Sequence, residues 1–128
     1  MSLLIPVSAG ELLDKLTILL IKKERVTVRK KLENISRELS QLETVCREQI
    51  TQSVELETLL SRLRLVNEQL WDIEDKIRAC ERDGLFDDTF VALARSVYKT
   101  NDRRAALKYQ INDVLGSDLV EEKSYETY

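Results

Sequence analysis

The feature that most constrains the fold is the near-absence of residues that break helices. No glycine or proline lies between Gly10 and Gly84, and the chain of 128 residues has only three glycines and one proline. Sandwiches and barrels need turn residues roughly every 8–12 positions. With 34% charged and 5% aromatic residues, the composition is typical of long helices. We therefore predict an all-α fold in a single domain.

Local signals set the expected helix boundaries. Ser8 and Glu11 have the spacing of a capping box. Gly84 and Gly116 are placed to end helices in the left-handed conformation, and Asp87 or Asp88 is placed to start the last one. The predicted organisation of domain 1–128 is an extended arm over 2–7, helices over 9–48, 53–83 and 87–115, and a tail over 117–128.

Two runs of apolar residues, over 28–46 and 56–80, alternate steps of three and four residues, which is a heptad pattern. The polar stretch between the runs predicts a turn, with Thr51 or Ser53 capping the second helix. Two such helices joined by a short turn form a long antiparallel, coiled-coil-like hairpin. We expect the third helix to pack back onto this hairpin because the connection to it is short.

The segment 12–21 is apolar on nearly every face. A helix that is apolar all round must be buried all round, which two neighbouring helices do not achieve. We therefore expect a homo-oligomer, a homodimer in its simplest form, with residues 12–21 at its centre. A further protein partner is part of the same expectation.

Composition also excludes several functions. The chain has no histidine, so the commonest metal ligand and general base is missing and a Ser-His-Asp triad is excluded. Cys46 and Cys80 form no CxxC pair, so no metal site or redox motif is predicted. The net charge of −3 does not favour a nucleic-acid partner. We predict no cofactor, and we assign no catalytic residue.

The chain shows no signal peptide and no membrane span. Its best apolar stretch, 12–21, contains Asp14 and Lys15 and is far shorter than the roughly 20 residues that cross a bilayer. With free thiols and no targeting segment, we expect a cytoplasmic protein.

Polar residues interrupt the faces that the second and third predicted helices would share. Antiparallel packing would bring Glu74 near Arg95, and Asn67 near Asn101. One interpretation is a buried polar layer that fixes the packing register. The other is a pocket for an anionic metabolite, in which Arg95, Arg104 and Lys15 bind the anion, Trp71 forms a wall, and Asp72 or Glu74 acts as acid or base.

Four blocks of the sequence, over 10–19, 66–75, 93–106 and 116–125, resemble an uncharacterised family of small, all-helical bacterial and phage proteins. The blocks read GELLDKLTIL, VNEQLWDIED, LARSVYKTNDRRAA and GSDLVEEKSY. The resemblance implies that the whole chain is one unit and implies no particular reaction. These blocks contain every candidate residue of the polar layer or ligand site: Glu11, Asp14, Lys15, Asn67, Trp71, Asp72, Glu74, Arg95, Tyr98, Asn101 and Arg104.

Two functions remain open from the sequence. The first is a helical module that self-associates and presents a surface to a protein partner. The second is a small all-helical enzyme or binding protein that takes an anionic metabolite between its second and third helices.

Overall fold

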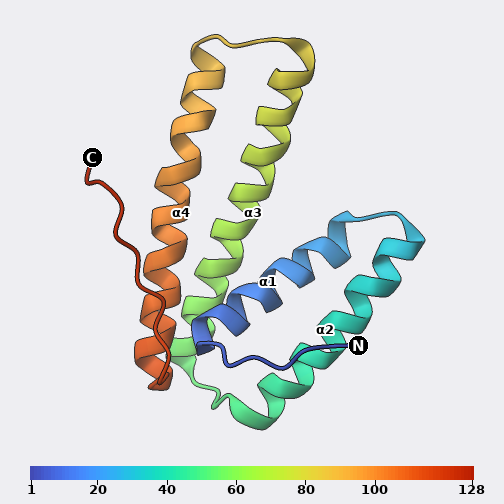
Figure 1. Cartoon of the computed structure of the whole chain (residues 1–128), viewed down its shortest axis with the longest axis vertical. Coiled ribbons are helices and arrows are strands. Elements are labelled where there is room, and N and C mark those ends of the chain that lie inside the picture. The colour runs from blue at the N-terminus through green and yellow to red at the C-terminus, as the bar shows by residue number, and fades with distance from the viewer.

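The computed structural model describes all 128 residues and contains four α-helices and no strand, which confirms the all-helical class (Figure 1). The helices are α1 (Ala9–Arg25), α2 (Arg29–Gln49), α3 (Val54–Asp83) and α4 (Asp88–Leu115). Helix α1 contacts each of the other three helices, and α3 and α4 run side by side over their whole length (Figure 1). None of the helices is long and apolar enough to cross a bilayer.

The segment 9–48 is two helices, not the single helix that the sequence predicted. Val26 is the residue that caps the end of α1, and Val28 is the residue that precedes α2. Both have extended backbone angles. The break consists of three β-branched residues in a row, Val26, Thr27 and Val28, a residue type that favours extended conformations. The chain reverses there, so that Arg29–Gln49 folds back along α1 (Figure 1).

This reversal changes the partner of the first heptad run. The backbone of α2 approaches that of α1 and of no other helix, and Lys15 of α1 pairs with Glu38 of α2 at 3.1 Å. The predicted coiled-coil pairing of 28–46 with 56–80 is therefore absent. The long antiparallel hairpin of the molecule is formed by α3 and α4 instead.

The helix ends follow the local signals. The side chains of Ser8, Ser53 and Asp87 accept hydrogen bonds from backbone N–H groups three residues later, at 3.1, 3.1 and 3.2 Å. Gly84 and Gly116 end α3 and α4 with φ of 66° and 61°, a conformation that glycine adopts without steric cost. The sequence singled out all five of these residues. Ser8, Gly84 and Gly116 were named individually, and Ser53 and Asp87 were each named as one of a pair.

The apolar core lies where α1 meets the lower halves of α3 and α4. Since α2 covers a further side of α1, the apolar residues of the segment 12–21 are buried or half-buried within one chain. A second subunit is not needed to cover it, which removes the reason for placing an oligomer interface there. The core residues are Leu12, Leu13, Cys46, Leu56, Leu59, Leu63, Val66, Leu107 and Ile111.

Beyond this core, α3 and α4 continue as a two-helix projection over residues 68–99, which we call the distal arm (Figure 1). No residue of the distal arm is buried, whereas Asn67 and Thr100 at its base are. Trp71 and Asp72 contact Arg25 of α1, and Tyr98 contacts Tyr128 of the tail. Otherwise the two helices of the arm pack on each other and leave apolar surface in water, as the exposed Leu85, Phe86 and Val91 show.

Candidate functional site

Asp14 is the centre of a buried polar cluster at the junction of α1, α3 and α4. Its side chain accepts hydrogen bonds from Arg104 Nε at 3.0 Å and from Asn67 Nδ2 at 2.9 Å, and Arg104 Nη2 bonds its second oxygen. Thr17 joins the cluster, because its Oγ1 donates to the Asp14 carbonyl and accepts from Asn67, both at 2.8 Å. We call Asp14, Thr17, Asn67 and Arg104 the Asp14 layer.

Electrostatics hold this layer together. Asp14 is only 1% exposed, and a buried carboxylate is tolerated only when it is paired and hydrogen-bonded. The hydrogen bonds that Arg104 donates to Asp14 raise the pKa of Arg104, against the smaller opposing effect of burial. No buried side-chain nitrogen or oxygen in the protein lacks a hydrogen-bond partner. The layer is therefore a closed structure in which every buried side-chain nitrogen and oxygen has a partner.

Lys108 extends the layer towards the surface. Its side chain is 9% exposed, and its Nζ donates to Glu11 at 2.8 Å and to Glu121 of the tail at 2.7 Å, with Asp14 3.9 Å away. Burial lowers the pKa of Lys108, but the hydrogen bonds to Glu11 and Glu121 outweigh burial and leave it raised. The same bond to Lys108 lowers the pKa of Glu121.

The first turn of α1 docks directly onto the end of α4. Gly10 N donates to Asn112 Oδ1 at 2.6 Å, and Ala9 N donates to Ser117 Oγ at 3.2 Å. These bonds satisfy N–H groups that the start of a helix otherwise leaves free. A Cβ at position 10 would lie 2.6 Å from the Lys108 carbonyl oxygen, so only glycine permits this approach.

Neither of the two predicted cross-helix pairs forms. Glu74 bonds Arg78 on its own helix at 2.8 Å instead of Arg95, which is exposed. Asn67 points into the Asp14 layer and bonds α1 instead of Asn101. For Asn67 the cause is α1, which lies against the α3–α4 pair and supplies Asp14 and Thr17 as polar partners.

The remaining candidates are dispersed. Trp71 and Asp72 face the end of α1, where Arg25 bonds Asp72 at 2.6 Å and lies 5.8 Å from the Trp71 ring centroid. Lys15 lies on the α2 side of α1, and Tyr98 packs edge-on against Tyr128 of the tail, with ring centroids 5.3 Å apart. The structure thus brings together Glu11, Asp14, Asn67 and Arg104 and separates the other candidates.

Sequence reasoning missed Lys108, Thr17, Asn112 and Ser117. Lys108 had a usable signal: it stands between Leu107 and Ile111, on an apolar stripe, one helical turn after Arg104. A lysine at such a position needs a carboxylate partner.

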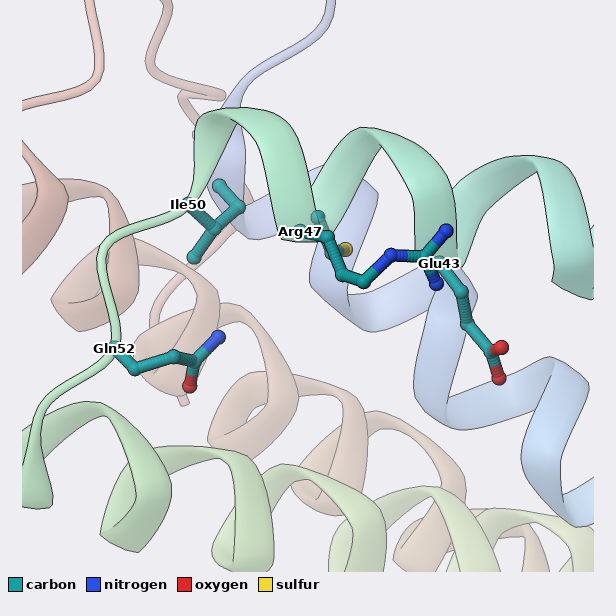
Figure 2. A pocket seen from close by; sticks show the side chains of 5 residues that line it. Glu43, Arg47, Ile50 and Gln52 are labelled. Carbon is teal, nitrogen blue, oxygen red and sulfur yellow. The ribbon is translucent and has the colours of Figure 1, made fainter.

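A cavity lies away from the layer, at the end of α2 (Figure 2). It has a volume of about 450 Å³ and is lined by Glu43, Cys46, Arg47, Ile50 and Gln52. Burial, aided by Glu43, raises the pKa of the Cys46 thiol, which keeps it protonated and unreactive. No cluster of three or more metal-binding side chains is present anywhere in the chain. No candidate residue of the site lines this cavity.

Glu121→Gln should reduce the loss in the free energy of unfolding that occurs as the pH falls into the acid range. Because the folded pKa of Glu121 is lowered below 4.5, its contribution is present above the unfolded pKa and is lost as pH falls through the folded value. Lys108, with a pKa raised above 10.5, stays charged throughout this range. The Glu121 side chain is 44% exposed, so we expect an effect of at most about 1 kcal/mol.

The measurement is the free energy of unfolding in urea at about pH 7 and about pH 3. Glu122→Gln, which neutralises the neighbouring carboxylate, should follow the wild type. An equal loss of stability on acidification in the wild type and in Glu121→Gln would contradict the role given to the Lys108–Glu121 bond.

Fold and site together define a four-helix protein whose first helix is fixed to the α3–α4 hairpin by a closed polar layer. A family model described as a family of unknown function (DUF6165) matches residues 3–128. The chain belongs to this family, and the resemblance to an uncharacterised family is confirmed at that level. No curated protein and no solved structure matches the chain.

Proposed function

We propose that this chain is a helical protein-interaction module that self-associates, and that two copies join through the distal arm. The arm carries apolar side chains from both helices, yet none of its residues is buried. A two-helix projection has too little core to be stable in isolation, whereas two such projections side by side form a four-helix bundle with a shared core. This interface differs from the one that the sequence predicted at segment 12–21, because other parts of the same chain already cover that segment.

The single observation that carries this proposal is the exposed area of the chain. Its accessible surface is 9235 Å². A compact monomer of 14.9 kDa exposes about 7,000 Å² by the usual scaling with mass, so the excess is roughly 2,200 Å². Each subunit of an obligate homodimer hides roughly 1,000–2,500 Å². The extended residues 2–7 and the tail account for part of the excess, and the distal arm supplies the helical part.

The alternative, a pocket for an anionic metabolite, has weaker support. Arg104 is already bound by Asp14, and Arg95 lies apart on the distal arm. The cavity at the end of α2 is lined by none of the residues proposed to bind the anion. A polar layer that stabilises the helix packing is the simpler account of these contacts.

The free Cys46 and Cys80 favour a reducing compartment such as the cytoplasm.

Val91→Glu should abolish or strongly weaken self-association. Val91 is 50% exposed on the distal arm, so a glutamate there is solvated in a monomer but becomes buried and unpaired in the proposed interface. We expect at least a tenfold rise in the dimer dissociation constant, measured by sedimentation equilibrium.

Val54→Glu is the matched control. Val54 is also an exposed valine on a helix, 80% exposed at the start of α3 and remote from the arm. It should leave the dissociation constant unchanged, and circular dichroism should show both variants folded. Equal dissociation constants for Val91→Glu and the wild type would remove the distal arm as the interface.

A further inference from the structure

The C-terminal tail lies along α4 without helix or strand of its own (Figure 1). We propose that the face of α4 beneath it, centred on Lys108, is a docking site for an acidic, extended segment of a protein partner, and that residues 117–128 occupy this site as an intramolecular competitor. This inference is independent of self-association through the distal arm.

The contacts of the tail define the chemistry of the site. At one end, Glu121 bonds the Nζ of Lys108 at 2.7 Å. At the other end, the hydroxyl of Tyr128 donates to Asp102 at 2.6 Å and its ring packs on Tyr98. Ser117 at the start of the tail accepts a hydrogen bond from Ala9 N at 3.2 Å. Beyond it, a carboxylate and an aromatic residue seven positions further on make the contacts with side chains of α4.

Charge complementarity supports an acidic occupant. Residues 99–108 of α4 carry four basic side chains and one acidic one, whereas the tail carries four acidic side chains and one basic one. Opposite charges on two surfaces steer association and fix its register. The basic residues of this stretch are Lys99, Arg103, Arg104 and Lys108, of which Arg104 is paired with Asp14.

Lys108 has more hydrogen-bond donors than the four helices provide acceptors for. Its ammonium group has three N–H donors in a nearly buried position. Within the helices, only Glu11 lies within hydrogen-bond distance. Departure of Glu121 would leave a donor to be satisfied by water or by another carboxylate, and a carboxylate gives the stronger, charge-assisted bond.

The tail is held loosely enough to be displaced. Leu119, Val120 and Tyr125 remain exposed, so the tail buries little apolar surface. A cavity of about 400 Å³ lies between the tail and α4, lined by Asp102 and Ala105 of α4 and by tail residues 123 and 125–128. Few anchoring bonds and incomplete packing are the properties of an exchangeable ligand rather than of a core element.

The test uses the full chain and a synthetic peptide with the sequence of residues 117–128, carrying a fluorescent label at its N-terminus. Glu121→Gln in the chain weakens the intramolecular competitor and leaves Lys108 intact. Fluorescence anisotropy should show this variant binding the peptide about three- to fivefold more tightly than the wild-type chain, because the peptide now supplies the only Glu121 carboxylate.

Three controls make the result specific. Glu122→Gln in the chain should bind the peptide as weakly as the wild type. A peptide with glutamine in place of its own Glu121 should bind the Glu121→Gln chain about three- to fivefold more weakly than the unmodified peptide. Val91→Glu should not alter peptide binding, so the outcome separates this proposal from self-association.

Two results would overturn the proposal. One is that the Glu121→Gln chain binds the peptide no better than the Glu122→Gln chain does. The other is that the peptide and its glutamine variant bind equally, which would show that Lys108 does not recognise the carboxylate.

Discussion

Asp14→Ala should lower the free energy of unfolding by about 3–5 kcal/mol, the cost of removing one partner from a buried ion pair. The substitution takes away the acceptor of Arg104 and of Asn67 at once and leaves both donors at a helix junction from which water is largely excluded. Since small domains are stable by only about 5–15 kcal/mol, this is a large share of the total. Urea unfolding followed by circular dichroism, at fixed protein concentration, measures it.

Glu24→Ala is the matched control for Asp14→Ala. Glu24 is also an acidic residue of α1 and also pairs with an arginine, Arg64 of α3. This pair, however, is exposed. Exposed pairs contribute about 0–1 kcal/mol, so the control should lose no more than that. A loss for Asp14→Ala as small as the loss for Glu24→Ala would show that the layer does not hold the helices together.

Gly10→Ala should cost about 2–3 kcal/mol, although alanine is the better helix former. The added Cβ would lie 2.6 Å from the carbonyl oxygen of Lys108 and 2.9 Å from Asn112 Oδ1. Helix α1 must move away from α4, which lengthens the bond from Gly10 N to Asn112 and disturbs the contact between Glu11 and Lys108. The measurement is again the free energy of unfolding in urea.

A second substitution shows whether the added Cβ at position 10 clashes with the backbone of Lys108 or with the side chain of Asn112. Asn112→Ala removes the side-chain oxygen but not the carbonyl of Lys108, which is the closest atom. The double variant Gly10→Ala, Asn112→Ala should therefore be no more stable than Gly10→Ala alone. Wild-type stability in Gly10→Ala would contradict the close approach of the two helices.

The sequence predicted the parts of the fold that depend on local chemistry. Ser53, Asp87, Gly84 and Gly116 mark helix ends because a cap or a left-handed residue acts within one turn of its own position. The turn over Val26–Val28 has no such marker, only three β-branched residues within a long apolar pattern. A heptad pattern shows that a face is buried but not which helix buries it, so the partner of α2 was predicted wrongly.

The site shows the same division between local and long-range information. Asp14, Asn67 and Arg104 were recognisable as polar residues on apolar faces, because that is a property of each helix by itself. Their mutual contacts join positions 53 and 90 residues apart and depend on how α1 crosses α3 and α4. Lys108 likewise gains its role from Glu11, 97 residues away, and from a tail with no helical period.

The most direct test of the central claim is the molar mass of the full chain in solution. Size-exclusion chromatography with multi-angle light scattering, at several micromolar concentrations, should give about 30 kDa, twice the 14.9 kDa of one chain, as a two-fold homodimer requires. A single species with the mass of one chain at every concentration would contradict self-association through the distal arm.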